Sequence, residues 1–291
     1  MYEGFERLQI DTSGGATINL VKGGDGPPLL LLHGYPQSHM MWHKIAPRLA
    51  EDFTVVVPDL RGYGDSNKVP GDPEHLNYSK RAMAQDQVDV MTHLGFDTFK
   101  LVGHDRGARV SHRLTKDHQQ HVERLMVLDI IPTHKMFQIV NKEMATNTYH
   151  WFFLIQPYDF PERVIGADPD YFVRRSFRRN PEAEGAFPPE VVDEYARCFS
   201  DPGTIHATCE DYRAGASIDL VHDEADFDNK VTIPMFALWS ATGYVGRTQD
   251  VLAVWREYAT NVRGQSLPCG HYIPEEMPDE SYAIIKSFLQ E

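Results

Sequence analysis

The sequence predicts an α/β fold built on a mostly parallel central sheet, with helices on both faces of the sheet and a helical insertion. Short apolar runs, typical of buried strands, alternate with helical patterns over residues 1–131, and this alternation returns over residues 229–291. Residues 132–228 contain no convincing apolar strand. We therefore expect a core formed by residues 1–131 and 229–291, interrupted by a helical cap insertion of residues 132–228.

The core is expected to begin with two strands that Gly14 and Gly15 connect as an antiparallel edge hairpin. The strands that follow are almost entirely apolar, as expected of parallel strands that are covered on both faces. Helical patterns separate these strands. The predicted strands are residues 5–10, 16–21, 29–32, 53–57, 99–102 and 122–130, and the predicted helices are residues 41–50, 79–94 and a third that starts near residue 108.

The insertion is rich in aromatic residues and prolines, and only helices are predicted in it. Its clearest helical stretches are residues 170–178 and 189–198. The sheet pattern then resumes and ends in an amphipathic helix. The predicted strands of this last part are residues 233–239 and 265–267, and its predicted helices are residues 248–259 and 278–289.

Charge and composition exclude several classes of function. The 291 residues carry a net charge of -14, so a nucleic-acid partner is not expected and an anionic substrate would need local cations. The three cysteines are too few and too scattered for a disulfide framework or a zinc site. The first ten residues contain no apolar segment, and the longest apolar run is far too short to span a membrane. We expect a cytoplasmic protein without a signal peptide.

The motif Gly103-His104-Asp105-Arg106-Gly107 lies between a predicted strand and a predicted helix. This is the G-x-x-x-G frame of a nucleophile elbow, a sharp turn that presents one side chain above a parallel sheet. The central residue is an aspartate and not a serine. A carboxylate nucleophile forms an ester with an alkyl carbon, so Asp105 suits displacement at carbon better than direct acyl transfer.

An α/β-hydrolase site places the acid and then a late histidine after the nucleophile. His271 follows the last predicted strand, where such a histidine is expected. The acid has two candidate positions, one after each of two strands. Residues 240–244, after the strand 233–239, include no carboxylate, whereas Asp129 closes the strand 122–130. We therefore assign the acid to Asp129, which would orient the imidazole and stabilise its charged form.

The segment His33-Gly34-Tyr35-Pro36 follows the apolar run of residues 29–32 and indicates an oxyanion-hole loop. We expect the donors to be the backbone N–H groups of Tyr35 and Arg106. With an aspartate nucleophile such a hole has a role only in a second step, when water attacks an ester carbonyl and a tetrahedral anion forms.

Three motifs carry a family resemblance: residues 32–36 (LHGYP), 59–66 (DLRGYGDS) and 103–107 (GHDRG). Together they resemble the dehalogenase and epoxide hydrolase branch of the α/β-hydrolases, and the resemblance covers essentially the whole chain. Haloalkane dehalogenases and many epoxide hydrolases carry Trp directly after the nucleophile, where this chain carries Arg106. The sequence is therefore most similar to the haloacetate dehalogenases, which include fluoroacetate dehalogenase.

The resemblance implies roles for five further residues. Arg106 and Arg109 would bind the substrate carboxylate, since two planar guanidinium groups can orient its α-carbon over the attacking oxygen. His150, Trp151 and Tyr212 would stabilise the departing halide through N–H and O–H donors. No metal or organic cofactor is implied, and members of the family are often dimers.

The implied reaction has two steps. Asp105 attacks the α-carbon of a haloacetate, expels halide and forms a glycolyl ester. His271, oriented by Asp129, then deprotonates a water molecule that attacks the ester carbonyl and releases glycolate.

Other functions use the same residues. An epoxide hydrolase would keep Asp105, Asp129 and His271 and take a cap tyrosine such as Tyr212 as its acid. The arginine pair counts against this function, because an apolar epoxide offers two buried guanidinium groups no partner. A small-ligand receptor without activity is disfavoured by the complete triad, and a serine-type esterase by the missing hydroxyl at the elbow.

Overall fold

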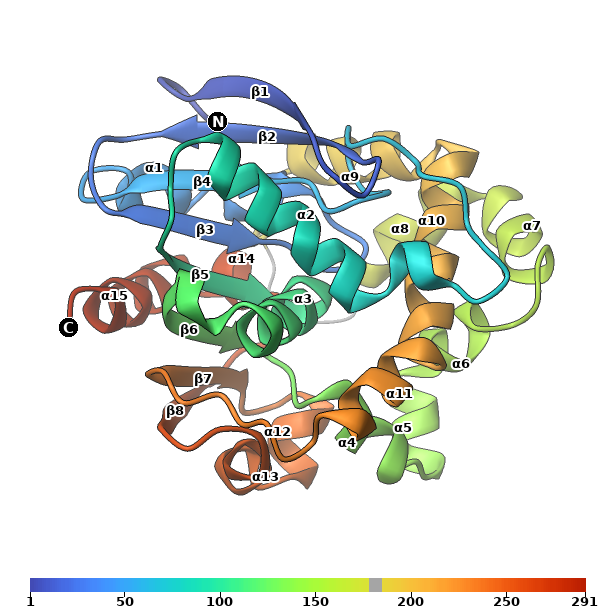
Figure 1. Cartoon of the computed structure of the whole chain (residues 1–291). Coiled ribbons are helices and arrows are strands. Elements are labelled where there is room, and N and C mark those ends of the chain that lie inside the picture. Colours follow the sequence, from blue (N-terminus) through green and yellow to red (C-terminus); the bar gives the residue numbers. More distant parts are fainter. Residues whose placement is uncertain (178–184) are drawn as a thin grey trace.

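The computed structural model describes residues 1–177 and 185–291, and these contain one eight-stranded sheet of order β1-β2-β4-β3-β5-β6-β7-β8 (Figure 1). The pairs β1–β2 and β2–β4 are antiparallel, and every other neighbouring pair is parallel. The predicted α/β fold with a mostly parallel sheet is therefore confirmed. The strands are β1 (Glu6–Asp11), β2 (Thr17–Gly23), β3 (Pro28–Leu32), β4 (Thr54–Pro58), β5 (Phe99–His104), β6 (Val122–Leu128), β7 (Met235–Ser240) and β8 (Val262–Leu267).

Helices pack against this sheet, and Figure 1 shows α2 and α3 crossing one of its faces. The central strands β3 and β4 are almost wholly buried, which agrees with their apolar sequences. The helices of the core are α1 (Ala46–Leu49), α2 (Lys80–His93), α3 (Asp105–Asp117), α12 (Tyr244–Thr248), α13 (Val251–Tyr258), α14 (Ile273–Glu276) and α15 (Pro278–Leu289), and the 3-10 turns are His39–Trp42, Leu76–Tyr78 and Gln119–His121.

Between β6 and β7 the described residues form helices and no strand of the sheet. Figure 1 shows most of these helices grouped beyond one end of the sheet. The division of the chain into a core and a helical insertion of residues 132–228 remains a prediction. The helices are α4 (Thr133–Gln138), α5 (Lys142–Asn147), α6 (Tyr149–Leu154), α7 (Phe160–Gly166), α8 (Pro169–Phe177), α9 (Pro189–Phe199), α10 (Pro202–Gly215) and α11 (Ile218–Ala225).

The single helix predicted over residues 41–50 is wrong. The chain forms a 3-10 turn, His39–Trp42, followed by the separate short helix α1, Ala46–Leu49. Pro47 explains the break, since proline has no N–H and fits only the first turn of a helix.

The helix predicted over residues 248–259 corresponds to α13 and begins three residues later than predicted. Helix α12 ends at Thr248, and α13 begins at Val251. The side chain of Asp250 accepts a hydrogen bond from the Ala253 N–H at 2.9 Å, which caps the start of the second helix. The cap favours a new helix over continuation of the first.

Several other boundaries differ from the prediction by one to three residues. Strand β8 begins at Val262 instead of residue 265, because its place at the sheet edge leaves polar side chains exposed and hides the apolar alternation. The helix predicted at residues 170–178 corresponds to α8, Pro169–Phe177, and residue 178 lies outside the described residues.

No helix among the described residues is long and apolar enough to cross a membrane. The cysteines Cys198, Cys209 and Cys269 are free and buried.

The turn between β5 and α3 is the local feature that sets up the site. Asp105, the first residue of α3, has a φ of 46°, in the left-handed region that side chains other than glycine rarely adopt. A Cβ at Gly107 would lie 2.3 Å from the carbonyl oxygen of His33, and one at Gly103 would lie 2.4 Å from Ser111 Oγ. Both glycines are therefore required by the close approach of their neighbours.

We predict that Gly107→Ala lowers the free energy of unfolding by about 1–3 kcal/mol, because the added methyl group would overlap backbone atoms of Leu32 and His33 at the end of β3. The matched control is Gly166→Ala, where a Cβ would meet no atom within 4 Å. Urea unfolding monitored by circular dichroism measures both. Equal stability of the two variants would contradict this account of the elbow.

Candidate active site

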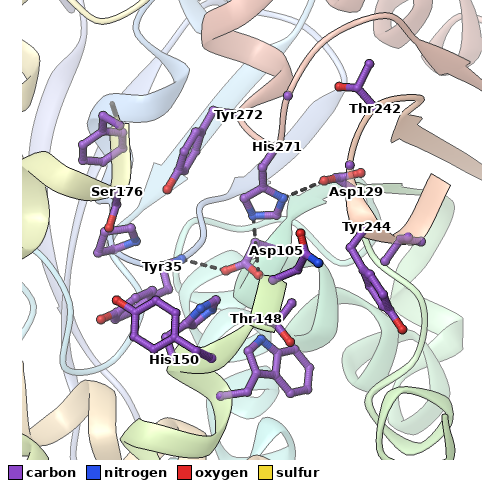
Figure 2. Close-up of a pocket in the computed structure, with 18 of the residues that line it drawn as sticks. Tyr35, Asp105, Asp129, Thr148, His150, Ser176, Thr242, Tyr244, His271 and Tyr272 are labelled. Carbon is purple, nitrogen blue, oxygen red and sulfur yellow. Dashed lines mark hydrogen bonds and ion pairs between the residues drawn. The ribbon is translucent and has the colours of Figure 1, made fainter. Parts of the chain in front are cut away.

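The three predicted catalytic residues come together at the carboxyl ends of the parallel strands (Figure 2). Asp105 follows β5, Asp129 follows β6, and His271 follows β8. Open α/β sheets bind their ligands at this edge, because the loops that follow the parallel strands lie next to one another there and form a crevice. Residues far apart in the sequence therefore meet at one point.

Asp105 is buried and holds its two carboxylate oxygens in different surroundings. Oδ1 accepts a hydrogen bond from the backbone N–H of Tyr35 at 2.8 Å, and Oδ2 lies 3.8 Å from His271 Nε2. Burial alone would raise the pKa of Asp105, but the charges of His271, Arg109 and Arg106 outweigh it and lower the pKa to about 2. The side chain is therefore a carboxylate at neutral pH.

His271 is oriented by Asp129. His271 Nδ1 lies 2.6 Å from Asp129 Oδ2, while Asp129 Oδ1 accepts the backbone N–H of Ser240 at 2.8 Å. Burial would lower the pKa of His271, but the hydrogen bond and charge of Asp129 and the charge of Asp105 outweigh it and raise the pKa. This geometry leaves Nε2 directed at the nucleophile side chain.

His104 supports the loop that carries His271. Its Nε2 donates to the carbonyl oxygen of His271 at 2.9 Å. Burial and the charge of His271 lower the pKa of His104 to about 4, so the ring is neutral at neutral pH. A neutral imidazole that donates to a carbonyl group fixes the loop without adding charge beside Asp105.

The predicted oxyanion-hole loop is held by His33. This buried ring donates from Nδ1 to the carbonyl oxygen of Gly34 at 3.0 Å and accepts the Leu60 N–H at Nε2 at 2.9 Å. A Cβ at Gly34 would lie 2.5 Å from the Asp105 Cβ, so only glycine lets this loop approach the nucleophile. The approach brings the Tyr35 N–H to the carboxylate.

A cavity of about 440 Å³ opens above Asp105. Its wall includes several of the predicted site residues, but Arg106 and Tyr212 are not among the residues that line it. The predicted residues on the wall are Tyr35, Asp105, Arg109, Asp129, His150, Trp151 and His271.

The guanidinium group of Arg106 is bound by a buried carboxylate. Arg106 Nε and Nη2 donate to Asp211 Oδ2 and Oδ1, each at 2.8 Å, and both side chains are almost fully buried. Asp211 also accepts the Tyr63 hydroxyl at 2.7 Å and pairs with Lys80 Nζ. Burial opposes ionisation of Asp211, but the charges of Arg106 and Lys80 hold its pKa well below the usual range.

Arg109 is placed differently, on the wall of the cavity. Its Nη1 donates to the Ile131 carbonyl at 3.0 Å and to Thr133 Oγ1 at 2.9 Å, and its guanidinium lies 4.5 Å from the ring centroid of Trp151. Its Nε is buried and has no hydrogen-bond partner in the part of the chain that the structure describes. Burial and the charge of Arg106 lower the pKa of Arg109 to about 10, which leaves it a cation at neutral pH.

The three predicted halide donors form one aromatic cluster. His150 and Trp151 lie on α6, and Tyr212 lies on α10, with ring centroids 5.7 Å and 6.0 Å from Tyr212 respectively. The Tyr35 ring joins them at 5.3 Å from Tyr212. The Tyr212 hydroxyl is buried and has no hydrogen-bond partner among residues 1–177 and 185–291. A buried donor of this kind favours a ligand that it can bind.

Two residues of the site, Asp211 and Ser240, are not predicted from the sequence. Asp211 directly precedes Tyr212 on α10, and its charge within a buried helix face was the available signal. Ser240 contributes a backbone N–H, which no side-chain pattern indicates. The described residues contain no group of three or more His, Cys, Asp or Glu side chains that could hold a metal ion.

Comparison with known proteins agrees with this fold. A family model described as the alpha/beta hydrolase fold matches residues 27–278. The chain is 47% identical to fluoroacetate dehalogenase from Burkholderia sp, covering 100% of this chain and 96% of that protein. It is 36% identical to soluble epoxide hydrolase from Corynebacterium sp. (strain C12), covering 91% and 90%. The crystal structure of ALR0039 from Nostoc sp PCC 7120 superposes with a TM-score of 0.97 at 57% identity, covering 100% of both chains.

The chain therefore belongs to the α/β-hydrolases and is an enzyme of that fold. Within this class it belongs to the haloacetate dehalogenase family, which includes fluoroacetate dehalogenase, as the sequence motifs predict.

The environment of Arg106 leads to a prediction about stability. Asp211→Asn should lower the free energy of unfolding by about 3–5 kcal/mol, because it leaves Arg106 buried without its counter-charge and removes one of the two carboxylates, Asp211 and Asp219, that pair with Lys80. The control is Asp279→Asn, whose side chain is 84% exposed in its ion pair with Arg48, and which should change stability by less than about 0.5 kcal/mol. Urea unfolding compares them. A small effect of Asp211→Asn would show that the buried cluster is not held by charge.

Proposed function

We propose that this enzyme hydrolyses haloacetates, including fluoroacetate and chloroacetate, to glycolate and halide. The observation that supports this most strongly is the juxtaposition of two charges in one cavity. The Asp105 carboxylate occupies an elbow where other hydrolases place a hydroxyl, and the cation Arg109 lies on the same cavity wall. A carboxylate nucleophile beside a cation suits an anionic substrate that is attacked at carbon.

In the first step a carboxylate oxygen of Asp105 forms a bond to the α-carbon, and the carbon–halogen bond breaks. The halide leaves with the bonding electrons, and a glycolyl ester of Asp105 remains. The Tyr35 N–H binds Oδ1 at 2.8 Å, so Oδ2 is the oxygen available for attack. No proton moves in this step, and the low pKa of Asp105, set by His271 and the arginines against burial, keeps the nucleophile ionised.

In the second step His271 Nε2 takes a proton from a water molecule, whose oxygen attacks the carbonyl carbon of the ester. The tetrahedral anion is stabilised by the N–H of Tyr35 and, as the sequence predicts, by that of Arg106. Collapse breaks the ester bond, and glycolate leaves with the proton from His271. Asp129, 2.6 Å from His271 Nδ1, stabilises the imidazolium that forms in between.

The substrate carboxylate is proposed to bind both arginines, in unequal ways. Arg109 offers its guanidinium at the cavity wall. Two donor atoms of Arg106 are already bound to Asp211, so only its remaining Nη1 group is available to the substrate. Arg106 therefore offers at most one donor, whereas Arg109 supplies the main contact.

The departing halide is proposed to bind His150, Trp151 and Tyr212. The support is the clustering of these three rings and the unpartnered, buried Tyr212 hydroxyl among the described residues. Hydrogen-bond donors that gain strength as charge develops on the halogen lower the barrier to its departure.

Epoxide hydrolysis is the second candidate function. The same Tyr212 hydroxyl, acting as a ring-opening acid with Asp105 as nucleophile, favours it, and one relative is a soluble epoxide hydrolase. The cation at the cavity wall counts against it, since an apolar epoxide gives Arg109 no partner. We also propose a cytoplasmic location, because the three cysteines are free thiols, and a homodimer, on the basis of the family resemblance.

The direct test incubates the purified enzyme with fluoroacetate, with chloroacetate and with a simple epoxide, and follows halide, glycolate and diol. We predict halide and glycolate in equal amounts and no diol. Asp105→Asn should lose more than about 99% of halide release, because an amide is not a nucleophile at carbon. Diol from the epoxide with no halide from either acid would reverse the ranking of the two functions.

The site also predicts the pH dependence of kcat with chloroacetate. His271 must be neutral to act as base, and Asp129 raises its pKa above the ordinary value of about 6.5. The rate should therefore be full above the raised pKa and fall about tenfold per unit as the pH drops below it. An acid limb with its midpoint below pH 6.5, or no acid limb, would contradict the assignment of His271 as base.

A further inference from the structure

Arg247 is a second arginine on the wall of the catalytic cavity. It lies on α12, and it lines the same cavity as Asp105 and Arg109. Figure 2 shows Thr242 and Tyr244, from the start of this segment, along one side of the site. The Arg247 side chain is 46% exposed, whereas Arg109 is buried. A residue that both lines the cavity and contacts solvent marks the mouth of the cavity.

An ion pair joins Arg247 to the insertion. Arg247 Nη2 lies 3.3 Å from Glu143 Oε1, and Arg247 Nε donates to the Thr242 carbonyl at 3.1 Å. Glu143 belongs to α5, so the pair links a core helix to a helix of the insertion. Its carboxylate side chain is 50% exposed. Exposed ion pairs contribute little to stability, so another carboxylate can replace Glu143 at little cost.

The charges around the cavity explain why a cation at the mouth would have a role. The chain has a net charge of -14, and the acids Asp105, Asp129 and Glu276 line the cavity. An approaching anion is therefore repelled until it meets a cation. Among the described residues of the cavity wall, the arginines and lysines are Arg109 and Arg247, and only Arg247 contacts solvent substantially.

We propose that Arg247 forms an outer anion-binding site, where the carboxylate of an incoming haloacid displaces Glu143 before the substrate moves inward to Arg109. The inference rests on the proposed function for the identity of the anion. When no substrate is bound, Glu143 pairs with Arg247, and it therefore competes with the substrate for this arginine. Arg247 therefore sets the preference for anions at the mouth, and Glu143 weakens that preference.

An ion pair that only ties the insertion to the core makes a different prediction. In a purely structural tie, removing either partner breaks the same contact, so Arg247→Gln and Glu143→Gln would shift kinetics in the same direction. In an anion site the two partners act in opposite senses, because one attracts the substrate and the other competes with it. The signs of the two effects separate these alternatives.

The experiment measures kcat and KM for chloroacetate at low and high ionic strength. Arg247→Gln should lower kcat/KM about 3–5-fold at low salt through KM, with kcat unchanged, since one partly exposed charge contributes about 1 kcal/mol. Glu143→Gln should raise kcat/KM about 2–3-fold, and Arg247→Lys should lie close to wild type. Added salt should reduce the difference in kcat/KM between the wild-type enzyme and Arg247→Gln, because it screens the attraction between Arg247 and the substrate. The control is Arg48→Gln, which breaks an exposed ion pair at a residue outside the cavity wall and should change nothing.

Binding of acetate, an unreactive carboxylate, provides a readout that does not depend on turnover. Calorimetry should show weaker acetate binding to Arg247→Gln than to wild type. Shifts of the two Gln variants in the same direction, or unchanged kcat/KM and acetate binding in Arg247→Gln, would overturn the outer site. A wild-type enzyme that releases no halide would instead overturn the proposed function, and the acetate measurement would still judge the anion site.

Discussion

The site depends on the left-handed backbone conformation of Asp105 at the end of β5. A residue with a side chain at a φ of 46° costs about 1–2 kcal/mol relative to its ordinary conformations. The surrounding structure compensates, since Gly103, Gly107 and Gly34 permit approaches that no other residue allows. The result is a carboxylate that stands above the sheet, with the Tyr35 N–H at one oxygen and His271 near the other.

The two arginines near this carboxylate differ in whether their charge is compensated by a neighbouring acid. Asp211 compensates Arg106 within a buried cluster that joins helix α10 to the core. Arg109 has no carboxylate among its hydrogen-bond partners in the described residues, and it is therefore the cation that the cavity presents to an anion. Two arginines that look equivalent in the sequence, one helical turn apart, thus have different partners. The difference arises because a distant helix of the insertion delivers Asp211 to one of them only.

Local sequence patterns predicted the fold class and the positions of the chemistry because the responsible features are local. An apolar strand, two glycines and an aspartate suffice to indicate the elbow, and Asp129 and His271 each follow a recognisable strand. Contacts between the insertion and the core could not be predicted in the same way. The bond between Arg106 and Asp211 joins residues separated by more than a hundred positions, and no periodicity encodes it. The helix predicted over residues 41–50 is wrong for a local reason. Its apolar pattern favours one helix, but Pro47 allows a helix only from Ala46 onward.

The central claim is that Asp105 becomes covalently bound to the substrate. The most direct test is a single turnover of chloroacetate in heavy-oxygen water with the enzyme in excess, followed by mass spectrometry of the peptide that contains Asp105 and of the glycolate. The account predicts that the heavy oxygen enters the Asp105 carboxylate, because water attacks the carbonyl carbon of the ester. Heavy oxygen that appears in glycolate during this first turnover, with none in Asp105, would contradict the covalent route.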